Sequence, residues 1–325
     1  LDNGLTYTDG AGRIFGRFHI LSGNVLITGD NNNVFKVSNA TGFFQKIIGG
    51  DFETNSATGN FSFIGGGQNN ITQGPNGVVV GGSSNSGSQD CFVGAGTSNQ
   101  TSGQYGSIVA GKNNKAHGSY AFIGGGEQNE APKQHAAVVA GKTNKTSGNY
   151  DFIGAGLENG VNGPGSAIVA GGNNAVVGTQ SFLGAGTDNF LIADGGVLAG
   201  GITNKNYSDY GVLGGGDTNI LQDNAYGVLV GGQFCSGGAA NVALLGGKYN
   251  AATATKSTVV GGEANSGLGI YCFVGGGLSN LTSGQSNVIC GGDQNRTDNV
   301  SYATVVGGIS NTGIGAHSCI VGGRQ

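Results

Sequence analysis

The sequence predicts an all-β fold, a parallel β-roll solenoid whose coils of about 15 residues each hold two short strands. Two observations predict it. Two hydrophobic residues, a Gly doublet and an Asn three residues later recur along the chain, first clearly at residues 63–70. Within this phrase, apolar side chains are expected on both faces of an extended strand, because side chains alternate with period two.

The reference residue of each repeat is the second Gly of the doublet. Its spacings are nearly all 15, with one of 14 and two of 16. We therefore expect a β-rich collar at residues 1–43, followed at residues 44–325 by a solenoid of about nineteen coils that stack at roughly 4.8 Å each. The reference residues are Gly67, Gly82, Gly96, Gly111, Gly126, Gly141, Gly156, Gly171, Gly186, Gly201, Gly216, Gly232, Gly247, Gly262, Gly277, Gly292, Gly308 and Gly323.

Three residues before the reference Gly, every repeat has Ile, Val or Leu, which predicts a buried column. Ile64, Val79 and Val138 belong to it. The residues four and two before the Gly lie on the opposite strand face, where a large ring is always paired with Gly. This pairing keeps the side-chain volume of each coil similar, which indicates a packed face. The paired rings are Phe63, Phe92, Phe122, Phe152, Phe182 and Phe273.

A strand that is apolar on both faces must be covered on both sides. A coil of about 15 residues can cover one face with its own second strand. The other face would remain as a continuous apolar stripe, larger than a monomer usually exposes. We expect this stripe to be an oligomer interface, most simply between three rolls around one axis.

The turns have their own columns. Asn stands three residues after the reference Gly in all complete repeats except the one with Cys235. The Gly supplies the positive φ of a tight turn, and stacked Asn amides can bond along the coil axis as a ladder. A second Gly at the seventh position indicates the other turn or a close approach of strands, and the polar segments between predict an outer, solvated strand. The first ladder residues are Asn70, Asn85, Asn99, Asn114, Asn129 and Asn144.

Phrases such as residues 55–65 (NSATGNFSFIG) and 103–114 (GQYGSIVAGKNN) resemble the head repeats of trimeric autotransporter adhesins of the YadA type. The Gly doublet is more similar to the glycine-rich repeats of phage and large-virus tail fibre proteins. Residues 22–29 and 35–39 are similar to connector segments of phage fibres. The resemblance covers residues 47–325 and implies a left-handed, homotrimeric β-roll.

Composition narrows the class of protein. Seventy Gly, 10% charged residues and the absence of Met and Trp do not suit an ordinary enzyme domain, while the regular apolar columns do not suit disorder. A net charge of −4 gives no basic patch for nucleic acid and no polybasic membrane signal. Apolar runs are too short to cross a bilayer. Five Cys at irregular spacing are expected to be buried or interface thiols, with disulfides as the alternative.

Seven of the ten Tyr share one column, two residues before the Phe column. We expect their rings to extend the packed face with the hydroxyls at its rim; a stripe for carbohydrate stacking is the alternative. The seven are Tyr105, Tyr120, Tyr150, Tyr210, Tyr226, Tyr271 and Tyr302.

Residues 186–232 depart most from the pattern. Asp194 and Asp209 align in one column, and Asp223 lies next to the Asn that continues it. Because neighbouring carboxylates repel unless a cation or protonation relieves them, these three residues are candidate Ca²⁺ ligands, with a solvated acidic edge as the alternative. No other cofactor is expected.

Apolar residues also fall on the expected polar strand in this region. They make it the candidate ligand patch, which comprises Phe190, Tyr207, Tyr210 and Tyr226.

The four His form no cluster, and no catalytic triad or phosphate loop is recognisable, so we expect no enzyme activity. The expected function is that of an extracellular structural protein: a rigid rod of a virion tail fibre or cell surface that mediates host attachment, with itself and a surface glycan or protein receptor as partners. Alternatives are a cellular adhesin head and a subunit of a homopolymeric filament. Since Leu1 is not a natural start, we expect a segment of a longer polypeptide.

Overall fold

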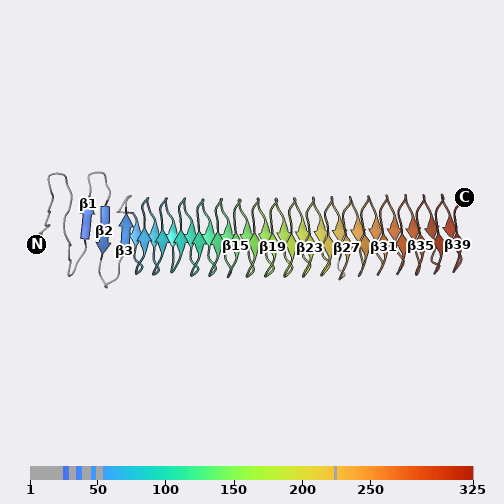
Figure 1. The fold of residues 1–325 in the computed structure, drawn as a ribbon, viewed down its shortest axis with the longest axis horizontal. Helices are drawn as coiled ribbons and strands as arrows, with labels where there is room; N and C mark the ends of the chain where they lie inside the picture. The colour runs from blue at the N-terminus through green and yellow to red at the C-terminus, as the bar shows by residue number, and fades with distance from the viewer. Residues whose placement is uncertain (1–24, 29–33, 39–44, 49–53, 223–224, 325) are drawn as a thin grey trace, which may run out of the picture.

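The computed structural model describes residues 25–28, 34–38, 45–48, 54–222 and 225–324. They form an all-β parallel solenoid of about 18 turns, which confirms the fold class predicted from the repeat. The coils lie side by side in a straight rod, with the first coils of the chain at one end and the last coils at the other (Figure 1). Within these residues there is no helix long and apolar enough to cross a membrane.

Each coil contributes one strand to each of two parallel sheets. In the first sheet, Phe122 pairs with Ala137 and Ile123 with Val138, so equivalent positions of successive coils lie in register. The second sheet repeats this arrangement, for example between Lys115 and Glu130. The turn that leads from the first sheet to the second is called the first turn, and the return is the second turn. Each coil is therefore bonded only to the coil before and the coil after it.

The strands of the first sheet each span two residues. In chain order they are β5 (Phe63–Ile64), β7 (Val78–Val79), β9 (Phe92–Val93), β11 (Ser107–Ile108), β13 (Phe122–Ile123), β15 (Ala137–Val138), β17 (Phe152–Ile153), β19 (Ala167–Ile168), β21 (Phe182–Leu183), β23 (Val197–Leu198), β25 (Val212–Leu213), β27 (Val228–Leu229), β29 (Ala243–Leu244), β31 (Thr258–Val259), β33 (Phe273–Val274), β35 (Val288–Ile289), β37 (Thr304–Val305) and β39 (Cys319–Ile320).

The strands of the second sheet alternate with them along the chain. They are β4 (Ser56–Ala57), β6 (Ile71–Thr72), β8 (Ser86–Gly87), β10 (Gln100–Thr101), β12 (Lys115–Ala116), β14 (Glu130–Ala131), β16 (Lys145–Thr146), β18 (Gly160–Val161), β20 (Ala175–Val176), β22 (Phe190–Leu191), β24 (Lys205–Asn206), β26 (Ile220–Leu221), β28 (Ser236–Gly237), β30 (Ala251–Ala252), β32 (Ser266–Gly267), β34 (Leu281–Thr282), β36 (Arg296–Thr297) and β38 (Thr312–Gly313).

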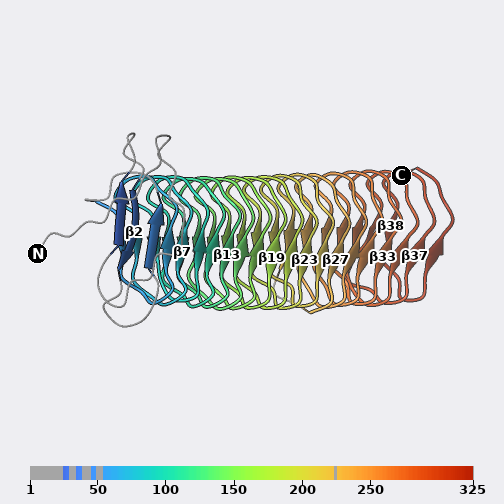
Figure 2. The same cartoon turned by 60° about the vertical axis from the view of Figure 1, so that its left-hand side comes forward.

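Three longer strands begin the described chain: β1 (Val25–Thr28), β2 (Val34–Ser38) and β3 (Gln45–Ile48). β1 pairs antiparallel with β2, and β2 pairs antiparallel with β3. β3 then pairs parallel with β5, so that these strands extend the first sheet at its N-terminal end (Figure 2). Of the collar expected at residues 1–43, the structure describes β1 and β2, and the other collar residues lie outside the described part of the chain.

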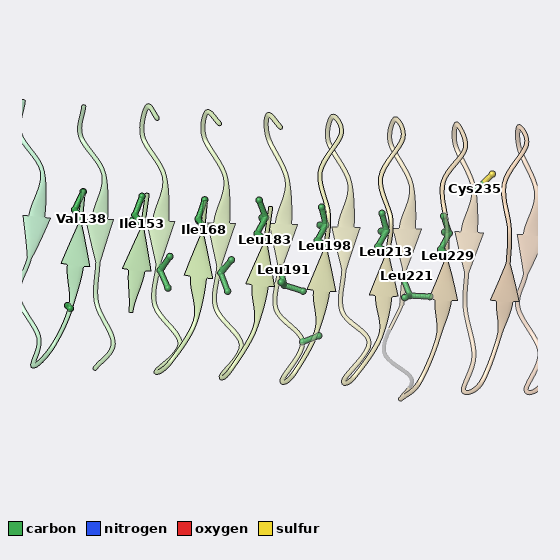
Figure 3. Packing of buried hydrophobic residues seen from close by; sticks show 14 of the residues in the cluster. Val138, Ile153, Ile168, Leu183, Leu191, Leu198, Leu213, Leu221, Leu229 and Cys235 are labelled. Carbon is green, nitrogen blue, oxygen red and sulfur yellow. The ribbon is translucent and has the colours of Figure 1, made fainter. Parts of the chain in front are cut away.

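The core lies between the two sheets. Ile64, Val79 and Val138, from the column three before the reference Gly, are completely buried. Leu191 and Leu221 of the second sheet reach the same core from the opposite side (Figure 3). Burying one aliphatic side chain is worth about 1.5–3 kcal/mol, so the rod depends on the sum over many coils.

The second strand is only half solvated, which corrects the expectation of an outer, solvated strand. Its first residue lies at the surface and its second is buried, as Lys115 and Ala116 show. Side chains alternate along any strand, so one of each pair must enter the core. In several coils this residue is small, as in Ala116, Ala131 and Thr146, and in others it is Leu, as in Leu191.

The first turn is held by a ladder of buried Asn side chains. In one typical rung, Asn159 accepts hydrogen bonds from the backbone N–H and the side-chain Nδ2 of Asn174 through Oδ1, both at 3.1 Å. Its own Nδ2 donates to the carbonyl oxygens of Ala155 at 3.2 Å and Gly171 at 2.9 Å. The amide thus satisfies polar backbone groups of the turn that would otherwise be buried without partners.

Each turn also requires left-handed backbone. In the first turn the reference Gly and the residue two after it both have positive φ, as in Gly67 (89°) and Asn69 (57°). The Gly at the seventh position, by contrast, allows neighbouring coils to approach, because a Cβ on Gly103 would overlap the carbonyl oxygen of Gly118.

Cys235 interrupts the Asn ladder and allows a test of its strength. Its own N–H still bonds to Asn219 Oδ1 at 2.9 Å, but the N–H of Asn250 meets the Cys235 sulfur, a weak acceptor, where the other rungs offer an amide oxygen. We expect Cys235→Asn to supply the stronger acceptor and to raise stability by about 1 kcal/mol.

Thermal unfolding and the amide exchange rate of Asn250 would measure the effect. The matched reverse change, Asn159→Cys, should lower the melting temperature. Equal melting temperatures for all three chains would show that the ladder contributes nothing to stability.

Candidate functional site

A continuous column of exposed apolar side chains lies on the outside of the first sheet. It consists of the residues four and two before each reference Gly, and we call it the Phe/Val face. Phe92 and Val109 on it are 39% and 47% exposed. Phe63 is half-buried there, so these rings lie outside the core of the single chain. The face also carries the predicted rings Phe92, Phe122, Phe152, Phe182 and Phe273.

The Phe rings lie low on this face. A Cβ on Gly65, Gly94 or Gly275 would come within 3.3–3.4 Å of Cε1 of the Phe two residues earlier, which shows that each ring leans across the Gly of its own strand. The carbonyl of the next coil also lies against these Gly residues. From residue 63 to residue 321 neither column contains a charged residue. The result is an even apolar surface along the whole length of the described solenoid.

The Tyr column lies in the second turn, beside the Phe/Val face. Tyr105, Tyr120, His135 and Tyr150 form a stack with successive ring centroids 4.9, 4.8 and 4.9 Å apart. All four have positive φ, which is a strained backbone conformation for a bulky side chain. The inner rings are covered on both sides by their neighbours, so a sugar cannot stack on them. Only ring edges and hydroxyls face outward along this stack.

The acidic column proposed for Ca²⁺ makes hydrogen bonds to the backbone. Asp194 Oδ1 accepts from the N–H of Thr179 at 2.7 Å, and Asp209 Oδ1 accepts from the N–H of Asp194 at 2.9 Å. The first of these bonds lowers the pKa of Asp194. Asp223 lies outside the described residues, among which there is no group of three or more His, Cys, Asp or Glu that could hold a metal. Each carboxylate bonds to the preceding coil, which offsets the repulsion between them.

The residues of the candidate ligand patch form two pairs. Phe190 and Tyr207 meet edge to face on the outside of the second sheet, with centroids 6.2 Å apart. Tyr210 and Tyr226 stack in the second turn at 5.6 Å. Ile192, two residues after Phe190, is 39% exposed. This part of the second sheet has more apolar side chains than β12, β14 and β16, which present Lys and Glu to solvent, although Lys205 of β24 pairs with Phe190.

The five Cys are all free thiols. Cys91, Cys235 and Cys272 are buried, and Cys290 and Cys319 are exposed. Both exposed thiols belong to the columns of the Phe/Val face. Two of the five thus lie where another chain can reach them.

Alternating charges on the first turn and on the adjoining second sheet were not identified from the sequence. Lys112 and Lys142 flank Glu127 at 3.8 and 3.6 Å, and Lys145 lies 3.1 Å from Glu130. The signal was present: successive coils read Lys-Asn-Asn-Lys, Glu-Gln-Asn-Glu and Lys-Thr-Asn-Lys. These pairs are exposed and each contributes little to stability. Glu130 also lines a groove of about 500 Å³, together with Ser98, Asn113, Lys115, Gln128, Asn129 and Thr143.

One carboxylate is fully buried. Asp151 lies inside the second turn, where Oδ2 accepts from the N–H of Gly148 at 2.6 Å and Oδ1 from the N–H of Ser166 at 3.4 Å. Burial raises its pKa, and the two backbone bonds oppose this shift. In the next coil Ser166 Oγ accepts from the N–H of Ser181 at 2.9 Å, so the column forms a second internal ladder.

A scan against protein-family models finds no match for this chain, and a search among curated proteins finds no significant relative.

The buried carboxylate predicts a pH-dependent stability. Because folding raises the pKa of Asp151, its contribution favours folding below the ordinary value of 3.8 and is lost as the pH rises through the folded-state pKa. We expect Asp151→Ser, which introduces the residue of the next two coils, to stabilise the chain at neutral pH by on the order of 1 kcal/mol.

Melting temperatures measured across the acidic range would show a smaller loss of stability with rising pH in the variant than in the parent. Parallel pH curves for the two chains would contradict this account.

Proposed function

We propose that this chain is a non-enzymatic structural and adhesive segment of an extracellular fibre. It forms a rigid homotrimeric rod, with left-handed coils, on a virion or a cell surface and supports attachment to a host. The main support for this proposal is the Phe/Val face. An apolar stripe without charged residues along a whole rod is unfavourable in contact with water and is expected to be buried against another surface. A second copy of the same chain has a matching stripe of the same length.

The evenness of the face supports packing of sheet against sheet. Phe rings lean over Gly, and many coils with smaller residues at the Phe position carry Val two residues later, as in Ala137 and Val139. Most of these coils therefore present a similar volume, which suits close packing between flat surfaces. A closed ring of three copies covers every face around one axis, and three is the number that the sequence resemblance implies.

Rigidity follows from the way in which the coils are bonded. Every coil joins both neighbours through two sheets and the Asn ladder, so bending the rod would break bonds in several columns together. A stiff rod can hold a binding surface away from the particle or cell that carries it. Repeated copies multiply weak contacts through avidity.

We propose that the attachment surface includes Phe190, Tyr207, Tyr210 and Tyr226. The pair Phe190–Tyr207 lies on the second sheet, facing away from the proposed trimer axis, and Ile192, two residues after Phe190, is exposed. Aromatic side chains are frequent anchors in protein interfaces and can stack on sugars. The partner would be a surface glycan or protein receptor.

The oligomer is tested by mass in solution. Light scattering without denaturant should give about three times 32.1 kDa. Val139→Lys combined with Val169→Lys should give a folded monomer, because the two charges would be buried without partners in the interface. Thr143→Lys, exposed on the first turn of the same region, is the control and should leave the mass unchanged. A parent chain of monomeric mass would contradict the trimer.

The attachment surface is tested by adsorption of labelled rods to host cells and to a panel of immobilised neutral and acidic polysaccharides. Phe190→Ala with Tyr207→Ala should lose binding, since the paired rings are removed. The control is Phe234→Ala with Tyr249→Ala, which removes a stacked aromatic pair of the first turn. Equal loss in both variants would show that binding does not depend on the proposed patch.

A further inference from the structure

The Phe/Val face has two borders of different chemistry. On one side lies the second-turn column, six residues before each reference Gly, which includes the Tyr and His rings and Lys256. On the other side lies the first-turn column, one residue after the reference Gly, which includes Lys112, Glu127 and Glu263. Within one chain the strand of the first sheet separates them.

Symmetry determines which borders meet when copies assemble through this face. A rotation axis parallel to the rod keeps each coil at its own height, so one border of a copy adjoins the opposite border of the next copy, coil for coil. Antiparallel copies would instead bring like borders together. The two arrangements therefore make different contacts from the same face.

One described coil has opposite charges in these two columns. Lys256 stands on the second-turn border and Glu263 on the first-turn border of the coil with reference Gly262. Both side chains are exposed. Lys256 Nζ lies 3.1 Å from the Tyr271 hydroxyl oxygen and 4.8 Å from the centre of that ring, and Glu263 makes no ion pair within the described coils. Lys256 is thus held at the border with its charge uncompensated.

Other coils have compatible residues at the same two positions. A ring faces an exposed aliphatic side chain where Tyr150 would meet Leu157 and where Tyr271 would meet Leu278. A phenol faces a carboxylate where Tyr120 would meet Glu127. In the coils with His135 and Lys142, and with His317 and Arg324, no opposite charges would meet between copies.

We propose that neighbouring copies of this chain lie parallel and in register, with the ring-bearing border of one copy against the first-turn border of the next, and that Lys256 pairs with Glu263 of the adjacent copy. This inference rests on the proposed function, because it requires assembly through the Phe/Val face. It assigns a contact role to the strained rings, whose edges and hydroxyls face outward.

A carbodiimide applied to the full chain tests the pair. The reagent activates a carboxylate, the Lys amine displaces the activated group to form an amide, and the carbodiimide leaves as a urea. Covalent dimer and trimer should appear on a denaturing gel, with the Lys256 and Glu263 peptides joined. Lys256→Gln or Glu263→Gln should lose these products. Lys248→Gln, on the first-turn border opposite the uncharged Asn241, should retain them.

Charge reversal provides a second readout. Lys256→Glu and Glu263→Lys should each lose the covalent trimer, and the double variant should restore it. Light scattering on the same samples separates the two proposals. A trimeric mass without the Lys256–Glu263 product, or with Lys256 joined to another carboxylate, overturns the border assignment and leaves the trimer intact. A monomeric mass overturns the trimer and this inference together.

Discussion

Backbone hydrogen bonding between equivalent positions of successive coils is the constraint on which the rest of this structure depends. It places every side chain about 4.8 Å from its counterpart in the next coil. The side chains of one column must therefore be able to lie next to each other without clash or repulsion. The buried Asn amides meet this condition because Oδ1 accepts and Nδ2 donates within the same rung. Aliphatic side chains meet it in the core by simple contact.

Charged and aromatic side chains at equivalent positions would repel or crowd each other, and the structure relieves this in three ways. Lys and Glu alternate on the first turn, so unlike charges adjoin. Aligned carboxylates bond to the backbone of the preceding coil, as Asp194 does to Thr179. Aromatic rings stack, and their mutual contact helps to offset the cost of positive φ in the second turn. The surface is therefore organised by the same repeat distance as the core.

The period and the alternation of apolar residues were enough to predict the solenoid, its buried Ile64 column and an apolar stripe on the other face of the same strands. They were not enough to show that the second strand also faces the core, because small residues such as Ala116 and Thr146 resemble surface residues in a polar segment. The sequence also aligned Asp194 with Asp209 without showing that backbone N–H groups would satisfy them. That outcome depends on the turn geometry, which the residue types alone do not specify.

Every coil is bonded only to its two neighbours, and this has a mechanical consequence. A chain pulled from one end would unwind from that end, one coil at a time, while the remaining coils keep their contacts. Each released coil would lengthen the tether by roughly 50 Å of extended chain. Such a rod would be stiff under low force and would lengthen in steps under high force. The length of the repeat sets the size of each step.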